Sequence, residues 1–591
     1  MLNFFLRLFA LVGALATLLV VVGITVLLRD QYAVPSEPQN VVLTLDFDRP
    51  IVERPASSPL KVAMESDSIP LLDILHAIDS ARADPHVKGM VARFGSTEPP
   101  LADVEEIRAA IARFRASGKF TYAFGTTYGD FGTGNRAYFL ASAFQDIWLQ
   151  PVGTVGLTGL AIETPYAKSA LAKIGVGADF MQRKEYKSVM ETFTRDDMSD
   201  PVRANMQSLI DDLARQEADG IAETRKWTPA QVSQLMATGP FTADEALKAG
   251  LVTHIGYADQ LEQEIKKQAG KGARLLGAED YLGRLPPKRP AAKPATQVAL
   301  IYGTGLITSH GVGSDGLAGG DVMGADTVAG AFDAAARDKK IKAIIFRIDS
   351  PGGSPVASET IRRAVIHAED KGKPVFVTMG GEAASGGYWI AMNANEIVAE
   401  PGTLTGSIGV VGGKFLLGGL MQKLGVSWGM VSTGGNTGMW SMLADYTPEE
   451  KARVNALLDA TYAAFTQNVA AARKIPLAKM PDIAKGRVWT GAQAQKLGLV
   501  DQLGGYGVAL ADMRKKLGLK PGQIVELKLF PAPLTPSEKI MLILKKIGLE
   551  SLALDATLGK WQHVESELGP FVGALGGTGA VQTRMPGVVL Q

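Results

Sequence analysis

The 591-residue chain contains no cysteine, and this absence excludes several classes of site. Without a thiol there is no disulfide, no cysteine-protease nucleophile and no zinc site built from cysteine ligands. Histidine is scarce as well, and none of the six lies in a glycine-rich turn: His76, His86, His254, His310, His367 and His563. The sequence therefore offers no evident member of a Ser-His-Asp triad, although it does not exclude one.

An excess of charge of one sign is also missing. Lys and Arg number 61 against 60 for Asp and Glu, which gives a formal net charge of +1. Such a balance creates no field that would attract a polyanion, so we expect no nucleic-acid partner. The chain contains neither a P-loop motif nor a clear dinucleotide-binding motif. We therefore expect no nucleotide, no metal and no other cofactor.

One long apolar run stands at the N-terminus. Residues 8–28 form 21 positions without a charge, bounded by Arg7 and Arg29. A helix of that length spans a hydrocarbon core of about 30 Å, and the run exceeds the apolar region of a cleaved signal peptide. We expect residues 1–30 to form an uncleaved transmembrane anchor. The flanking charges are too evenly matched to set its orientation.

The rest of the chain divides into two α/β halves. A single core stops growing near about 250–300 residues, so a chain of this length needs more than one. Residues 37–283 and 297–532 each alternate apolar strands with helical segments, a pattern typical of a mostly parallel sheet covered by helices. Residues 284–296 are rich in proline and predict a stiff linker. Residues 533–591 read as a tail whose role the sequence does not indicate.

The two halves are repeats of each other. Residues 146–151 match 396–401, an offset of 401 − 151 = 250, and residues 250–252 match 498–500, an offset of 498 − 250 = 248. Each half also carries a long helix, one opening at Asp200-Pro201 and the other at Thr447-Pro448. Agreement in order and spacing over this length indicates an internal duplication.

A candidate nucleophile lies in the second half. Two glycine-rich turns follow apolar strands there, and the second contains Ser385. Small residues around one serine let a substrate approach its hydroxyl. The N–H groups of Gly386 and of Gly352 or Gly353 could hold an oxyanion. Because Ser-Gly-Gly alone is a weak motif, binding of a phosphate in these turns is a comparable alternative.

The repeat points to a candidate base in the other half. With the offset of 250, Ser385 corresponds to Asn135 and Lys187 corresponds to Thr437, so each half carries one group and lacks the other. A lysine acts as a base when burial keeps its amine neutral. The alternative is that Lys184 and Lys187 are solvated charges on a loop, as most lysines are.

Four motifs stand out: Tyr186-Lys187-Ser188 followed by Arg195-Asp196-Asp197-Met198-Ser199, Ser350-Pro351-Gly352-Gly353, Ala384-Ser385-Gly386-Gly387-Tyr388-Trp389 and Leu404-Thr405-Gly406-Ser407-Ile408-Gly409. On these motifs the chain, from near the anchor to about residue 530, resembles the long, tandem-domain form of the signal peptide peptidase A family, also called protease IV. The resemblance implies that Ser385 is the nucleophile, Lys187 the general base and Ser407 the residue that orients the lysine. It also implies tandem ClpP/crotonase-like domains and a homotetramer. Glu185, and the absence of proline in residues 190–193, depart from the family pattern.

The expected function is that of a membrane-anchored serine endopeptidase that works without ATP. By the resemblance, its substrates are cleaved signal peptides and other unfolded apolar peptides, and it lies in a bacterial inner membrane with its catalytic domains in the periplasm. Two alternatives stay open, a crotonase-type acyl-CoA enzyme and a non-catalytic membrane scaffold. The sequence does not indicate the side-chain preference at the cleaved bond, nor whether the dyad forms within or between chains.

Overall fold

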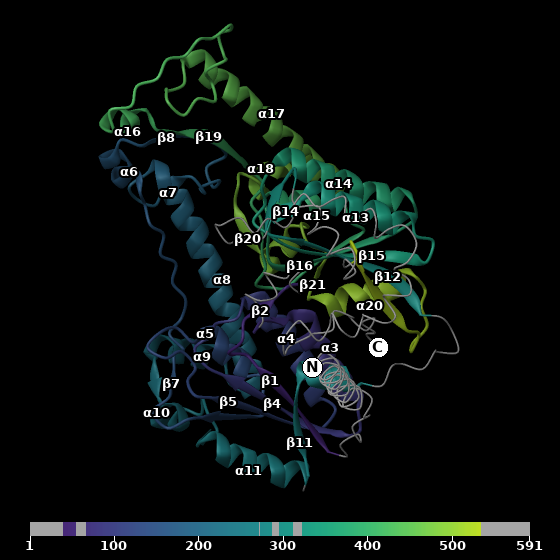
Figure 1. Ribbon diagram of the computed structural model, residues 1–591. Helices are drawn as coiled ribbons and strands as arrows, with labels where there is room; N and C mark the ends of the chain where they lie inside the picture. The colour runs from purple at the N-terminus through teal and green to yellow at the C-terminus, as the bar shows by residue number, and fades with distance from the viewer. Residues whose placement is uncertain (1–39, 55–66, 271, 286–294, 311–321, 533–591) are drawn as a thin grey trace, which may run out of the picture.

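The computed structural model describes residues 40–54, 67–270, 272–285, 295–310 and 322–532, and it contains two α/β units (Figure 1). The expected anchor at 1–30 and the expected tail at 533–591 lie outside the described residues. Within the described ranges, no helix has both the length and the apolar character needed to cross a membrane.

The first half forms a six-stranded parallel sheet with the strand order β10-β6-β5-β4-β1-β11. In chain order its strands are β1 (Val41–Asp46), β4 (Val87–Phe94), β5 (Phe120–Gly125), β6 (Asp146–Leu149), β10 (His254–Ile255) and β11 (Arg274–Gly277). Short pairs lie beside it, β2 (Ile51–Val52) with β3 (Ile69–Pro70) and β7 (Thr154–Val155) with β9 (Phe241–Thr242).

The second half forms an eight-stranded sheet whose main path is β20-β18-β16-β15-β12-β22, with β17 paired to β16 as a branch. β21 pairs with β17 and not with β16 itself. The strands are β12 (Thr296–Thr304), β15 (Ile341–Ser350), β16 (Val375–Ala384), β17 (Glu396–Ala399), β18 (Leu404–Gly406), β20 (Val488–Thr490), β21 (Gln502–Leu503) and β22 (Val525–Phe530). All pairs are parallel except β18 with β20. A short pair, β13 (Leu306–Thr308) with β14 (Val322–Gly324), lies apart.

Helices cover both sheets. Those of the first half are α3 (Leu71–Ala83), α4 (Leu101–Arg115), α5 (Asn135–Ala141), α6 (Lys168–Ile174), α7 (Glu191–Thr194), α8 (Asp200–Arg225), α9 (Pro229–Thr238), α10 (Ala243–Lys248), α11 (Ala258–Ala269) and α12 (Ala278–Arg284). Those of the second half are α13 (Ala325–Arg337), α14 (Pro355–Asp370), α15 (Gly386–Ala391), α16 (Gly418–Lys423), α17 (Pro448–Ala472), the 3-10 turn η1 (Leu477–Lys479), α18 (Met480–Ile483), α19 (Gly491–Lys496) and α20 (Tyr506–Lys516).

The internal duplication extends to single hydrogen bonds. The Tyr138 hydroxyl donates to Leu251 O at 2.8 Å in the first half, and the Tyr388 hydroxyl donates to Leu499 O at 2.9 Å in the second. The expected start of the second long helix is also confirmed, since Thr447 caps α17 in a capping box with Glu450. The two halves are therefore two copies of one mixed α/β fold.

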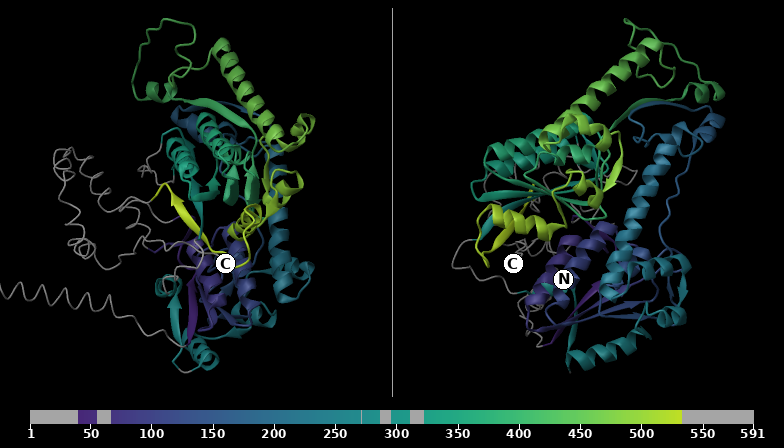
Figure 2. Two further views of the ribbon diagram at one scale, coloured as in Figure 1. Left: turned by 90° about the vertical axis from the view of Figure 1, so that its right-hand side faces the viewer. Right: turned by 180° about the vertical axis from the view of Figure 1, so that it is seen from behind.

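The two halves are joined by a shared hydrophobic core and by a two-stranded ribbon formed by residues 177–183 and 410–416, which we call the arm. Buried residues of α3 and α4 belong to the same hydrophobic cluster as Ile345 and Phe376 of the second sheet. At the far end, β8 (Gly177–Arg183) of the first half pairs antiparallel with β19 (Val410–Leu416) of the second. The long helices α8 and α17 lead from the two sheets to this ribbon (Figures 1 and 2). A segment of the first half is thereby held beside the second sheet.

Candidate active site

Ser385 lies where β16 ends and α15 begins. Its backbone has φ 55° and ψ −116°, a conformation that is unusual for a residue other than glycine. Its N–H donates to Gly406 O at 2.9 Å, and its side chain is half-buried. Strained backbone of this kind concentrates at functional sites, where the surrounding structure holds it in place.

The glycines predicted to hold an oxyanion lie directly against Ser385. A Cβ added to Gly352 would stand 2.8 Å from Ser385 Cβ and 2.6 Å from Gly386 N, and a Cβ added to Gly386 would stand 3.0 Å from Gly353 N. These positions therefore leave no room for a side chain. The N–H of Gly352 already donates to Ser350 Oγ at 3.2 Å, which leaves Gly353 and Gly386 as the better oxyanion donors. Because α15 has only six residues, its individual N–H groups matter more than its dipole.

Lys187 reaches the second half from the loop that follows β8. Its side chain is buried, with 8% of the residue exposed, and its Nζ donates to Ser407 Oγ at 2.8 Å and to Ser407 O at 3.0 Å. The alternative of a solvated Lys187 is therefore wrong, whereas Lys184 is exposed. Burial lowers the pKa of Lys187 to about 8, and the negative charge of Glu382 partly opposes this shift. An amine with this pKa is partly neutral near neutral pH.

The Lys187 amine and the Ser385 backbone are held by the neighbouring residues Ser407 and Gly406. Ser407 accepts the lysine amine, while the preceding residue, Gly406, accepts the N–H of Ser385. Among the described residues, Ser385 Oγ makes no hydrogen bond, either to Lys187 or to a histidine. Catalytic hydrogen bonds are often long without substrate and shorten when it binds. The structure thus brings Ser385, Lys187, Ser407 and the three glycines into one place.

Two acidic residues at this place were missed by the sequence reasoning. Glu382 N–H donates to Asp349 Oδ1 at 2.9 Å, and burial raises the pKa of both carboxyl groups. Glu382 also lies close enough to Lys187 for the two charges to influence each other. The signal was available, since a carboxylate three residues before a candidate nucleophile is exceptional in a turn of small residues.

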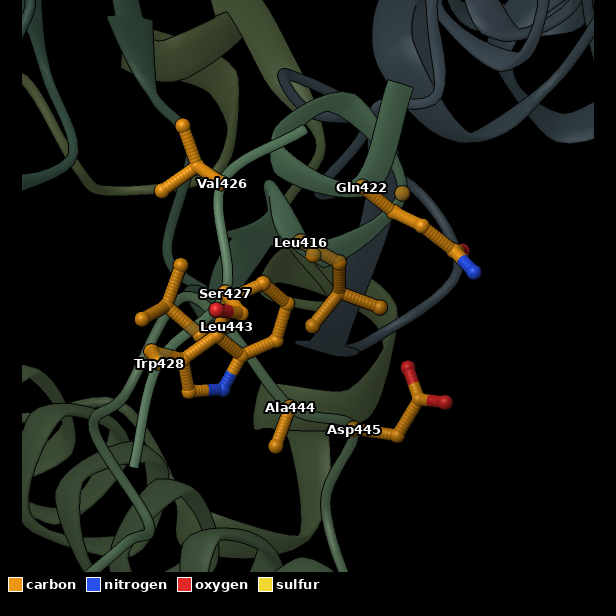
Figure 3. A pocket seen from close by; sticks show the side chains of 10 residues that line it. Leu416, Gln422, Val426, Ser427, Trp428, Leu443, Ala444 and Asp445 are labelled. Atoms are coloured by element: carbon orange, nitrogen blue, oxygen red, sulfur yellow. The ribbon is translucent and has the colours of Figure 1, made fainter. Parts of the chain in front are cut away.

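Two surface hollows lie away from Ser385 and Lys187. One, of about 450 Å³, is at the arm and is lined by Leu416, Trp428 and Asp445 among others (Figure 3). It contains none of the predicted site residues. Within the same described ranges, no cluster of three His, Asp or Glu side chains is arranged to hold a metal ion.

Comparison with known proteins settles the family. The model of peptidase family S49 matches residues 116–271 and 367–520, one stretch in each half. The chain belongs to this family. It is 34% identical over 505 residues to Protease 4 of Salmonella typhi, covering 81% of this chain and 78% of that protein. It is 32% identical over 457 residues to Protease 4 of Haemophilus influenzae, covering 75% and 72%. It is 30% identical over 525 residues to the chloroplastic serine protease SPPA of Arabidopsis thaliana, covering 86% and 73%.

These relatives confirm the resemblance and decide between the functional classes. Membership of family S49, together with the relatives' names, identifies a serine protease. They give no support to the two alternatives, an acyl-CoA enzyme and a non-catalytic scaffold.

Proposed function

We propose that this S49 peptidase cleaves peptides with a Ser/Lys dyad, in which Ser385 is the nucleophile and Lys187 the general base. One observation carries the proposal. The buried Lys187 amine is held by Ser407, and the residue next to Ser407 binds the backbone of Ser385. The amine comes from the first half and the hydroxyl from the second, so one folded chain supplies both groups.

The chemistry follows from these positions. Neutral Lys187 takes the proton of Ser385 Oγ as the oxygen attacks the scissile carbonyl. The N–H groups of Gly353 and Gly386 hold the oxyanion that forms, with Gly352 shaping the turn, and one such donor is worth about 2.7–4 kcal/mol. Protonated Lys187 then gives its proton to the leaving amine, and the acyl-enzyme ester remains. Lys187 next removes a proton from water as the water oxygen attacks the ester carbonyl, and it returns this proton to Ser385 Oγ when the carboxylic acid product leaves.

Ser407 has a positioning role in this scheme. Its hydroxyl and carbonyl oxygens both accept the amine, and its own backbone has φ 51°. With the amine fixed by two acceptors, little motion separates it from the nucleophile. A hydrogen bond to a charged partner is worth about 1.5–3 kcal/mol, enough to orient a flexible lysine.

The setting of the enzyme is part of the proposal. The apolar run at residues 8–28 anchors the chain in a bacterial inner membrane, and the catalytic domains lie in the periplasm. There the site meets cleaved signal peptides and other unfolded apolar segments as substrates. The domains have the ClpP/crotonase-like fold, four copies assemble, and the reaction needs neither cofactor nor ATP.

The decisive experiment is a peptidase assay on the full chain in detergent with a fluorogenic apolar peptide. We expect turnover by the wild type and its loss in Ser385→Ala and in Lys187→Ala. An acylating inhibitor should label Ser385, as read by mass spectrometry of the digested protein. Lys184→Ala is the matched control, since this exposed lysine lies three residues before the base.

Two results would reject the dyad. The first is turnover in either variant equal to that of the wild type, and the second is a label on a serine other than Ser385. Circular dichroism of both variants separates lost chemistry from lost folding.

A further inference from the structure

Two central strands of the second sheet, β15 and β16, leave their regular pairing just before the candidate nucleophile. Pairing is regular on either side of the break, with Ile348 opposite Met379 and Ser350 opposite Ala383. Asp349 alone therefore faces three residues, 380–382, which we call the bulge. Bulges are rare in parallel strand pairs and over-represented beside active sites, where they redirect a side chain.

Side chains bind the backbone of the bulge. Glu382 N–H donates to Asp349 Oδ1 at 2.9 Å, and the Gly381 N–H lowers the pKa of the same carboxyl group. Gly380 O accepts the hydroxyl of the buried Thr403 at 2.8 Å. A buried backbone N–H without a partner costs free energy. The Asp349 carboxylate therefore stabilises the bulge where the regular pairing is interrupted.

Asp349 also connects the two turns of the active site. Along the backbone it is followed by Ser350 and by the turn that carries Gly352 and Gly353. Through its side chain it holds the bulge, from which the chain runs into Ser385. The relative position of the two turns decides how far the serine hydroxyl lies from the oxyanion donors. A displacement of about 1 Å can cost about a hundredfold in rate.

The equivalent strand position of the first half carries no side chain. Residues 87–93 match 341–347, an offset of 347 − 93 = 254, so Asp349 corresponds to Gly95, since 349 − 254 = 95. A Cβ on Gly95 would stand 2.3 Å from Asp48 Oδ1. The half without the candidate serine therefore has no room for an aspartate at the corresponding position.

A fully buried arginine accompanies Asp349 on the same face of β15. Arg347 stands two residues earlier, and alternate residues of a strand share a face. Its guanidinium binds Glu53 of the first half, Nε to Oε2 at 2.8 Å and Nη2 to Oε1 at 2.7 Å, and its Nη1 donates to Glu106 Oε2 at 3.3 Å. Burial raises the pKa of Asp349 and the Glu53 charge adds to this rise, whereas the bound N–H and the Arg347 charge lower it. Arg347 thus offsets the repulsion among the carboxylates that meet at this contact.

Glu53 extends the contact between the halves to the bulge itself. A Cβ on Gly380 would stand 2.4 Å from Glu53 Oε1 and 3.1 Å from Asp349 Cβ. No side chain fits at Gly380, so the bulge lies directly against both carboxyl-bearing residues. The first half therefore packs against the bulge in addition to supplying Lys187.

We propose that Asp349 is a positioning residue for peptide cleavage, whose carboxylate holds the bulge and so keeps Ser385 beside the oxyanion donors. Asp349 acts through the backbone and makes no contact with the reacting atoms. The Glu53–Arg347 pair supports this carboxylate from the contact between the halves. The inference rests on the proposed function, because it takes Ser385 as the nucleophile.

The first test compares two substitutions at Asp349 by steady-state kinetics of the full chain in detergent with the fluorogenic peptide. Asp349→Ala removes the acceptor and should lower kcat by about ten- to a hundredfold, with KM close to the wild-type value. Asp349→Asn keeps an oxygen that accepts the Glu382 N–H, so it should recover most of the lost kcat. The acylating inhibitor should also label Ser385 more slowly in Asp349→Ala, because the same oxygen attacks it.

Another aspartate of the second half provides the matched control. Asp501 Oδ2 accepts the N–H of Ile397 at 2.8 Å, away from both turns. Asp501→Ala also removes a carboxylate that binds a strand N–H, so it should lower the midpoint of thermal unfolding measured by circular dichroism. Its kcat per folded enzyme should stay close to the wild-type value. The same unfolding curves give the folded fraction of Asp349→Ala at the assay temperature.

Three results would overturn the inference while Ser385→Ala stays inactive. They are a wild-type kcat in Asp349→Ala, no recovery of kcat in Asp349→Asn, and an equal loss of kcat per folded enzyme in Asp501→Ala. Turnover retained in Ser385→Ala would instead reject the proposed function, and this inference with it.

Discussion

The two halves of this S49 peptidase share a fold but differ at the turn that carries Ser385 in the second half. In the second half Ser385 N–H donates to Gly406 O at 2.9 Å, and in the first half Gly134 N–H donates to Gly156 O at 2.8 Å. The sequence offset had paired Ser385 with Asn135, whereas this hydrogen bond pairs it with Gly134. The turns therefore differ by one residue in their backbone path.

In the first half, the position equivalent to Ser385 has no room for a side chain. A Cβ at Gly134 would collide with the carbonyl oxygen of Tyr128. The Asn135 side chain accepts the N–H of Thr158 at 2.9 Å and donates to Gly159 O at 2.7 Å. The first-half turn thus differs from the second-half turn in backbone path as well as in residue type, and a single substitution would not make the two turns equivalent.

The lysine shows the opposite asymmetry. Lys187 is buried because the second half surrounds it, with Ser407 at its amine and Gly486 against its backbone, where a Cβ on Gly486 would stand 2.5 Å from Lys187 N. Its counterpart Thr437 is exposed. The same position in the repeat is buried only where the other half covers it. The pKa of the lysine amine is lowered by this burial, which residue type alone would not bring about.

Among the substitutions that test this comparison, replacement of Lys187 should have the largest effect on kcat/KM. Lys187→Ala should lower kcat/KM by roughly 10²- to 10⁴-fold, because a general base contributes about that much. Thr437→Ala, at the equivalent position of the other half, should leave kcat/KM within about twofold. Steady-state kinetics with the fluorogenic peptide measures both. Equal losses in the two variants would contradict a single functional lysine.

Removal of the lysine's acceptor should have a smaller effect. Ser407→Ala should lower kcat by about ten- to a hundredfold, since it removes one hydrogen bond to an amine that becomes charged. Ser407→Thr keeps the hydroxyl and should recover part of the loss. A KM that rises with kcat unchanged would show that Ser407 binds substrate instead of positioning Lys187.

The pH profile should report the buried amine. Lys187 must be neutral to act, and burial lowers its pKa to about 8, so kcat/KM should rise about tenfold per pH unit below that value and level off above it. The Glu382 charge raises the pKa of Lys187, so Glu382→Gln should move the rising limb to lower pH. Glu262→Gln, on the exposed face of α11, is the control and should leave the profile in place. A rising limb that moves to higher pH in Glu382→Gln would contradict the proposal that the Glu382 charge raises the pKa of Lys187.

An attempt to restore the first-half site should have no effect. Asn135→Ser in a Ser385→Ala background should show no turnover above that of Ser385→Ala alone. The first-half turn has neither a buried lysine beside it nor the backbone path that exposes Ser385 in the second half. The acylating inhibitor should leave residue 135 unlabelled in mass spectrometry. Measurable turnover would show that the two halves differ only in residue identity.

The sequence by itself determined the duplication and the family, and it predicted the residues of the proposed dyad. The apolar strands recur with the same spacing in both halves, which predicts two similar α/β units. Strands that are apolar on both faces indicate a parallel sheet with helices on each side. The motifs around Lys187 and Ser385 carry the resemblance that the relatives confirm. The capping box at Thr447 was also predictable from the sequence, because it depends only on Thr447 and Glu450, three residues apart.

Tertiary structure alone decided how the groups meet. The burial of Lys187, the bond from Gly352 N–H to Ser350 and the nearness of Glu382 all depend on contacts between distant segments. The one-residue difference at Gly134 was also invisible, because a constant offset cannot show a change in backbone path. Residue types follow from the sequence, but the environment that lowers an amine's pKa forms only when the two halves pack together.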